Sequence, residues 1–380
     1  MKKHIRINIP DWGASELANA ALALVGRSYT EALAGELQAF ALSGWQPYLL
    51  ASARYGLALA VKALGVRRVA VPGYICPAAL TGLRAGGAEI VAVDCASSSL
   101  LFDAQKLTET VLAGRVDAIL AANTYGIDQD YALLTNLGLP VIEDAAYQAG
   151  YNTCGVRGAA GVWSFNFKAL TAVGGGVLWL KSGTVTPNLP DQRLTAKEQL
   201  PLFANYALRA IVREYLPKKL GGAAPPSLEK ETGVRAVLQE MRAASMSELQ
   251  AAIAVTQWRR RTKLAVRQQE NTRILLDKVL ASCQTFKRLA DTEGQTKIHL
   301  FPLLVNATPE QAQESVYRVR CSLYDRGIQT ETPYPLLLGG PDELPNAHAL
   351  AARLLLVPCN TSLDETSIKY IATVLGSITI

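Results

Sequence analysis

The feature that most constrains the fold is a regular alternation of short apolar runs and helical patterns between residues 44 and 180. The patterns predict strands at Val69–Pro72, Ala88–Val93, Ala118–Ala122 and Pro140–Glu143, and helices at Ala53–Leu64, Pro77–Ala85 and Tyr131–Leu137. Strands that alternate with helices of this length form a mostly parallel sheet covered on both faces. Ligands of such sheets bind beyond the carboxyl ends of the strands. We therefore expect an α/β protein whose functional residues follow its strands.

The rest of the chain predicts a strand pair and a second, smaller α/β unit. The pair is Val162–Phe167 with Gly176–Leu180, around a glycine-rich turn. Further on, a long helical pattern over residues 247–280 opens with a Ser-x-x-Gln capping box. The later patterns predict strands at Ile298–Val305 and Leu354–Val357 and helices at Thr308–Arg326 and Ser362–Leu375. A chain of 380 residues is expected to hold about two domains. We expect a large domain over residues 1–240 and a small C-terminal α/β domain over 241–380, with Gly221–Pro226 as the best linker candidate.

Composition and charge exclude several function classes. The formal charge of +6 comes from scattered residues, and no basic stripe with interleaved aromatics predicts nucleic-acid binding. Six isolated cysteines and three histidines provide no zinc set at the usual spacings, and single cysteines fit a reducing cytosol. No run of about 18 apolar residues predicts a transmembrane helix. The basic, apolar stretch 203–219 is compatible with a membrane surface, but packing on the main domain or on a second subunit is the favoured interpretation. We expect a cytoplasmic protein with no nucleic-acid or membrane partner.

Two residues in the first domain suggest specific chemistry. Asp144 ends a predicted strand, where an acid ordinarily caps a helix or pairs with a base, and Lys168 follows an apolar run, where a lysine is usually on the surface. Three consecutive glycines at 174–176 leave room beside that lysine for a ligand. The functional interpretation is that Asp144 keeps a pyridine nitrogen protonated while Lys168 forms an imine and transfers protons. Ala146 is then small enough for the ring to lie against it.

Two further segments are candidates for the rest of such a site. Ala53 and Arg54 open a predicted helix, where free backbone N–H groups bind phosphate and an arginine adds a bidentate contact. The alternative is an ordinary helix capped by Ser52. Tyr74 follows a strand and is placed to stack on a flat ring, although an aromatic at such a place is more often part of the core or its rim.

Together and in order, these segments resemble the DegT/DnrJ/EryC1/StrS family of sugar aminotransferases, which depend on pyridoxal 5′-phosphate (PLP). The resemblance runs over almost the whole chain. Its most specific matches are LPVIEDAA at Leu139–Ala146 and MSELQAAI at Met246–Ile253, with further matches at Ala85–Asp94, Trp163–Gly176 and Tyr334–Pro335. It implies the PLP-dependent transferase fold type I and a homodimer with its active site at the subunit boundary. It also implies transfer of an amino group from an amino acid, commonly glutamate, to a nucleotide-linked keto-sugar.

The resemblance also assigns roles to individual residues. Lys168 is the lysine that holds PLP as an imine, and Asp144 is the partner of the pyridine nitrogen. Ser164 and the backbone amides of Ala53 and Arg54 form the phosphate cradle.

The sequence departs from the family pattern on the ring side of the predicted site. The stacking aromatic falls on Cys76 by strict count, and Tyr74 is its expected replacement. The glutamine expected three residues after the aspartate is Tyr147, with Gln148 following at once as the candidate cofactor contact.

A second departure concerns the segment that reaches towards the partner's cofactor phosphate in the family. Its asparagine and arginine are Ala243 and Ser245 here, and Arg54 is a candidate to restore the lost positive charge. Lys168 argues against the dehydratase branch, which has a histidine there. Two alternatives to transamination stay open: another PLP reaction of racemase, lyase or aldolase type, and a non-catalytic protein that keeps the fold.

Overall fold

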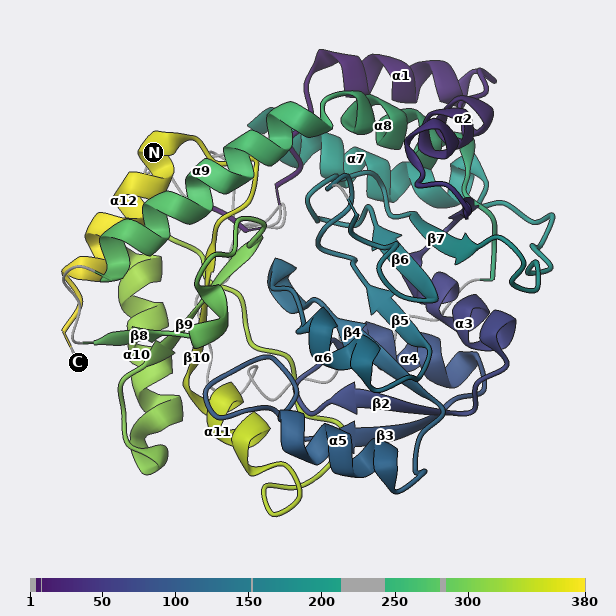
Figure 1. The fold of residues 1–380 in the computed structure, drawn as a ribbon. Helices are drawn as coiled ribbons and strands as arrows, with labels where there is room; N and C mark the ends of the chain where they lie inside the picture. The colour runs from purple at the N-terminus through teal and green to yellow at the C-terminus, as the bar shows by residue number, and fades with distance from the viewer. Residues whose placement is uncertain (1–4, 8, 152, 213–242, 281–284, 380) are drawn as a thin grey trace.

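The structure is a computed structural model, and it describes residues 5–7, 9–151, 153–212, 243–280 and 285–379 (Figure 1). The predicted division between residues 240 and 241 and the linker candidate at 221–226 lie outside the described residues.

The first part of the chain is built on a seven-stranded sheet, with strand order β1-β7-β6-β5-β4-β2-β3. Strand β7 runs antiparallel to its neighbours β1 and β6, and the remaining pairs are parallel. The mostly parallel sheet predicted from the sequence is therefore confirmed. The strands are β1 Trp45–Leu50, β2 Arg68–Pro72, β3 Glu89–Val93, β4 Ala118–Ala122, β5 Val141–Asp144, β6 Ala160–Ser164 and β7 Gly176–Lys181.

Helices cover both faces of this sheet because successive strand residues point to opposite sides. Val69 and Val71 of β2 pack with α3 and α4, whereas Ala70 between them packs with α5 and α6 on the other face. Near β6 and β7 that second face is covered by α1, α2 and α8, which surround Trp163 and Trp179. The helices are α1 Ala14–Leu24, α2 Thr30–Phe40, α3 Ala53–Leu64, α4 Pro77–Ala85, α5 Ala104–Leu112, α6 Tyr131–Asn136 and α8 Glu248–Arg259.

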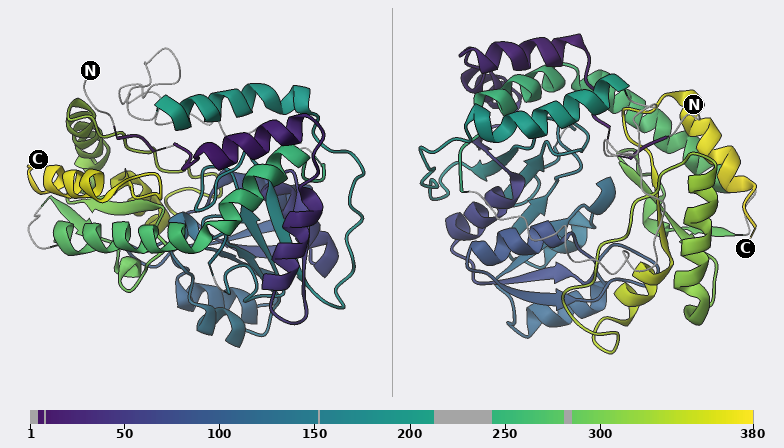
Figure 2. Two further views of the ribbon diagram at one scale, coloured as in Figure 1. Left: turned by 90° about the horizontal axis from the view of Figure 1, so that it is seen from above. Right: turned by 180° about the vertical axis from the view of Figure 1, so that it is seen from behind.

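The second part of the chain forms a smaller α/β unit beside the large sheet (Figures 1 and 2). Its three-stranded antiparallel sheet has the order β10-β9-β8, and α9 packs beside α12. The elements are β8 Phe286–Arg288, β9 Leu300–Val305, β10 Leu354–Pro358, α9 Arg261–Leu280, α10 Ala312–Asp325, α11 Pro345–Arg353 and α12 Glu365–Gly376.

The long helix predicted over residues 247–280 is two helices that meet at Arg260. The predicted capping box at the start of α8 is present, with Ser247 Oγ accepting from the Gln250 amide. At the junction, the Arg260 guanidinium pairs with Glu16 of α1 at 2.5 Å. Because of this break, α8 packs against the large sheet while α9 runs into the smaller unit, as Figure 1 shows.

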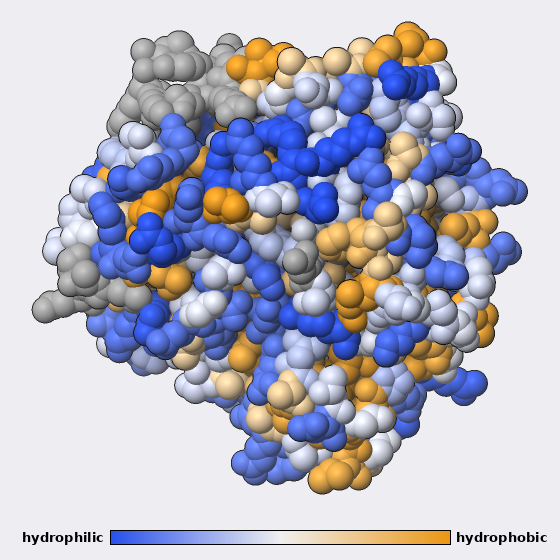
Figure 3. Space-filling model, turned by 45° about the horizontal axis from the view of Figure 1, so that its top comes forward, coloured by the Kyte–Doolittle hydropathy of each residue, from blue (hydrophilic) through white to orange (hydrophobic). Residues whose placement is uncertain are grey.

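Helix α7 (Ala196–Val212) begins where Thr195 and Glu198 cap each other. Its described part packs on the large unit, where Phe203 stacks on Trp12 at 6.0 Å between ring centroids. Figure 3 shows small orange areas interrupted by blue side chains on one face of the molecule. Among the described residues, no helix is long and apolar enough to span a bilayer.

The beginning of the described chain joins the two units. Ile5 forms a parallel bridge with Ile328, and Asn360 Nδ2 donates to the Ile7 carbonyl at 2.8 Å, so these residues pack in the smaller unit. A few residues later, Trp12 Nε1 donates to the Thr171 carbonyl at 2.7 Å in the large unit.

Candidate functional site

The candidate site lies where β5 and β6 end, at the carboxyl edge of the sheet. Asp144 is the last residue of β5, and Ser164 is the last residue of β6. The chain then turns through Phe167, which has a φ of 50°, into Lys168. A positive φ at a bulky residue is uncommon and is held by its surroundings. Here the turn is closed by the Ala172 amide, which donates to the Phe165 carbonyl at 2.7 Å.

Lys168 and Asp144 influence each other's charge. Burial lowers the pKa of Lys168 to about 8, and the negative charge of Asp144 opposes that change. Burial raises the pKa of Asp144 to about 6, opposed by a bond of 3.1 Å from the Ala146 amide and by the charge of Lys168. A lysine that readily loses its proton can act as a nucleophile and as a base. The geometry thus brings the two predicted residues to one place.

The neighbouring acid, Glu143, faces the opposite side of the strand and is fully buried. Arg157 binds it through Nη2 at 2.6 Å, Nε at 2.9 Å and the backbone amide at 3.0 Å. Gln148 belongs to the same network: its amide donates to Asp128 at 2.6 Å and accepts from Asn123 at 2.9 Å. Its predicted cofactor contact is therefore not part of this arrangement, because the side chain is committed elsewhere.

The second end of the site is the start of α3. Ser52 Oγ accepts from the Tyr55 amide at 3.2 Å and so caps the helix start that holds Ala53 and Arg54. The first turn of α3 contains no acid. Ser164 pairs with Gly176 across β6 and β7, and a Cβ on Gly176 would lie 2.5 Å from the Ala53 nitrogen. Only glycine permits this approach, so Ser164 and the helix start are brought together.

Four tyrosines from separate parts of the chain form a cluster that reaches Lys168 through Tyr147. The Tyr74 and Tyr125 hydroxyls lie 2.5 Å apart, and the Tyr147 and Tyr334 hydroxyls lie 2.6 Å apart. The Tyr334 amide also donates to the Tyr74 hydroxyl at 3.0 Å. Tyr74 is thus a buried member of a tyrosine cluster, and that cluster includes Tyr334 of the smaller unit.

Several residues near Lys168 were not predicted from the sequence as site residues. The Tyr147 ring lies directly under the Lys168 amine, and the charges of Cys76 and Glu331 raise the pKa of that amine. Tyr147 and Cys76 drew attention only as departures from a family pattern. Glu331 lies in the loop after α10, where no motif marks it. Their positions follow from long-range packing, which local periodicity does not encode.

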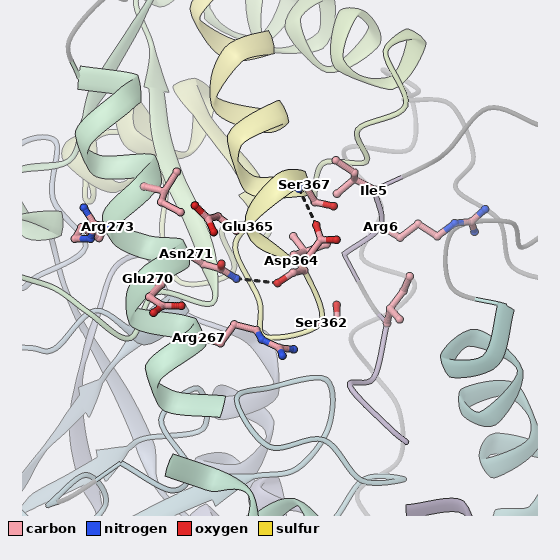
Figure 4. A pocket seen from close by; sticks show the side chains of 13 residues that line it. Ile5, Arg6, Arg267, Glu270, Asn271, Arg273, Ser362, Asp364, Glu365 and Ser367 are labelled. Carbon is pink, nitrogen blue, oxygen red and sulfur yellow. Dashed lines mark hydrogen bonds between the residues drawn. The ribbon is translucent and has the colours of Figure 1, made fainter. Parts of the chain in front are cut away.

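A separate cavity of about 540 Å³ lies in the smaller unit (Figure 4). It is lined by residues from the start of the chain, from α9 and from the start of α12, with Arg6, Arg267 and Asp364 among them. None of the predicted site residues lines it. The candidate site is therefore the edge of the large sheet.

The residues at that edge fit PLP. An amine of lowered pKa is available for an aldehyde, and a carboxylate faces the same space from β5. A hydroxyl and a helix start lie together where a phosphate would be bound. In the segment with Ala243 and Ser245, Ala243 is exposed and Ser245 Oγ donates to the Pro190 carbonyl of its own chain at 2.8 Å.

Comparison with known proteins places the chain among aminotransferases. The model of the DegT/DnrJ/EryC1/StrS aminotransferase family matches residues 25–197 and 230–376. Spr1654 from Streptococcus pneumoniae, solved in PLP and PMP forms, is 18% identical with TM-scores of 0.73 and 0.74 and 98% of each chain covered. PseC from Helicobacter pylori, an aminotransferase of pseudoaminic acid biosynthesis, is 16% identical with a TM-score of 0.72 and 98% of each chain covered.

A third solved structure with the same fold has a different activity. The GDP-4-keto-6-deoxy-D-mannose-3-dehydratase of E. coli, with bound hydrated PLP, is 17% identical with a TM-score of 0.72, and 99% of this chain and 100% of that chain are covered. Fold alone therefore does not select the reaction.

The chain belongs to the DegT/DnrJ/EryC1/StrS aminotransferase family. The family, the fold class, the enzyme class and the PLP cofactor predicted from the sequence are confirmed.

Proposed function

We propose that this chain transfers an amino group from an amino acid, with glutamate as the expected donor, to the carbonyl carbon of a keto-sugar. The observation that carries the proposal is that Lys168 and Asp144 lie near enough at the edge of the sheet for each charge to act on the other, where burial brings the lysine pKa to about 8. The keto-sugar acceptor is supported by the family and by the role of PseC in the biosynthesis of pseudoaminic acid.

PLP, when bound, supplies an electron sink that stabilises negative charge on the substrate carbon. Asp144 faces the pyridine nitrogen in this proposal and holds a proton there. The Lys168 Nζ is the group that bonds the cofactor, and once released it removes and returns the substrate proton. Ser164 and the amides of Ala53 and Arg54 bind the phosphate, and the small side chain of Ala146 leaves space for the ring.

We propose that the tyrosine cluster limits access of water to the reacting carbon. Tyr74 and Tyr125 are fully buried, and Tyr334 closes over them from the smaller unit. Tyr74 is then a wall of the site whose ring stands close to the cofactor.

The chain is further proposed to act as a homodimer. The support is the family resemblance together with the exposed apolar side chains of α7, among them Leu200 at 48% and Ile211 at 68% exposure. Sedimentation of the purified protein measures this directly, and a monomer would contradict it.

The test of the proposed function is the first half-reaction. Purified protein with bound PLP is mixed with glutamate, and the visible cofactor absorbance is expected to convert to that of the amine form as 2-oxoglutarate appears. Borohydride reduction beforehand is expected to tag the peptide that contains Lys168. Racemisation or loss of the amino acid without 2-oxoglutarate would favour another PLP reaction. No conversion with any amino donor would favour a non-catalytic protein.

A further inference from the structure

The side chain of Tyr147 lies directly against the amine of Lys168. The Lys168 Nζ is 3.4 Å from the centroid of the Tyr147 ring, and Tyr147 is 6% exposed. A cation over an aromatic face is attracted by the ring quadrupole, most strongly where water is excluded. This contact therefore favours the protonated amine at a position where burial disfavours it.

The Tyr147 ring is held in place from three sides. Tyr125 meets it edge to face at 5.8 Å between centroids, and the His299 ring lies 5.7 Å away. Its hydroxyl is 2.6 Å from the Tyr334 hydroxyl. A ring fixed in this way presents the same face to the lysine throughout a reaction.

We propose that the Tyr147 ring is the resting platform of the Lys168 amine whenever that amine is not bonded to the cofactor, which makes Tyr147 a positioning residue. The proposal rests on the proposed function for its role in turnover. The ring holds the ammonium without a fixed carboxylate partner, so the proton can be given up without breaking an ion pair. Phenylalanine would provide the same platform, since the face of the ring and not the hydroxyl contacts the amine.

The other titratable groups around Lys168 are consistent with this role. Asp144, Cys76 and Glu331 favour the protonated amine through their charge. His299 is kept neutral, because burial lowers its pKa to about 3, and it does not compete for the position. Loss of the Tyr147 ring removes one stabilising contact of the ammonium and leaves the burial in place, so the pKa of Lys168 should fall.

The test uses cofactor-free protein and is independent of turnover. Reductive methylation modifies neutral amines, and peptide mass spectrometry reports the modified fraction of Lys168 across pH. Tyr147→Leu and Tyr147→Met are expected to lower the pH midpoint by about one unit and to speed labelling about fivefold at pH 7. Tyr147→Phe is expected to keep the wild-type midpoint. An unchanged midpoint in both the Leu and Met variants, or an equal shift in the Phe variant, would overturn the proposal.

Two companion measurements separate this proposal from the proposed function. The pH profile of the reaction between the amine-form enzyme and 2-oxoglutarate is expected to shift to lower pH in the Leu variant and to be restored in the Phe variant. If PLP attaches to Lys168 neither in the wild-type protein nor in any variant, the proposed function fails. The labelling result then still decides whether the Tyr147 ring stabilises the Lys168 ammonium. Circular dichroism of each variant identifies one that does not fold, and the remaining non-aromatic variant then carries the test.

Discussion

Glu143 and Asp144 are adjacent acids on one strand, and their carboxyl groups differ in the number of hydrogen bonds that they receive. Glu143 is fully buried and receives three hydrogen bonds from Arg157. Asp144 receives one bond from the Ala146 amide, and burial raises its pKa to about 6. The two side chains point to opposite faces because strand residues alternate.

The difference indicates which acid holds the structure together and which serves the site. A buried carboxylate that is saturated by its own chain has no capacity left for a ligand. A buried carboxylate with few partners and a raised pKa lowers the stability of the folded protein, and such groups concentrate at functional sites. The contrast leads to four predictions with separable outcomes.

The largest effect is expected for Asp144→Asn. An amide cannot hold a proton on a pyridine nitrogen, so the half-reaction with glutamate should slow about 10³-fold. The cofactor-free variant should be up to about 3 kcal/mol more stable at pH 7, since a carboxyl with a raised folded-state pKa loses stability as pH rises from about 4 to 6. Stopped-flow absorbance and urea unfolding measure the two. A variant that reacts normally would remove Asp144 from the site.

Glu143→Gln is the matched control for Asp144→Asn, and we expect it to change stability and not the reaction rate. Removal of this charge leaves the Arg157 guanidinium with Asp128 as its remaining acid at 2.9 Å. The free energy of unfolding should fall by about 3 kcal/mol, while the half-reaction rate of the folded protein changes less than threefold. Loss of rate with unchanged stability would reverse the assignment of the two acids.

The comparison extends to two arginines. Arg157 pairs with Glu143 and Asp128 of its own chain, whereas Arg54 lies in the first turn of α3, at the helix start proposed to bind the phosphate. Arg54→Ala should raise the dissociation constant of PLP about tenfold, by loss of a charge-assisted contact to the phosphate. Arg54→Lys should keep part of the affinity. Unchanged affinity in the alanine variant would leave the phosphate to the backbone amides and Ser164.

The smallest effect concerns pH. Covalent attachment requires the neutral amine, and the Lys168 pKa of about 8 makes about a tenth of the amine neutral at pH 7. The attachment rate of PLP to cofactor-free protein should fall about tenfold per unit of pH well below 8 and level off above it. Borohydride trapping at timed intervals measures this rate. A rate still rising steeply above pH 9 would show an unshifted lysine.

The sequence predicted the part of the site that is local to strand ends. Asp144 and Ser164 end strands, and the glycines that follow Lys168 create close approaches that the sequence pattern signals. The sheet was predictable for the same reason, since periodicity and strand length are local.

The unpredicted parts depend on tertiary packing. Gln148 was expected at the cofactor, but its amide joins the network of Asn123 and Asp128, and Tyr147 faces the lysine in its place. One position along a turn decides which side chain faces the site. Tyr334 reaches the site from a distant loop, and the helix break at Arg260 depends on Glu16, so neither has a signal in the local pattern.

The attachment of the first described residues to the smaller unit has a consequence for biosynthesis. Ile7 bonds to Gln329 across 322 positions of sequence, so the ribosome must make nearly the whole chain before this contact can form. Contacts of such separation form late and slow the final assembly. Until then the newly made large sheet has an aromatic wall that still lacks Tyr334, and a nascent chain would expose this surface to chaperones.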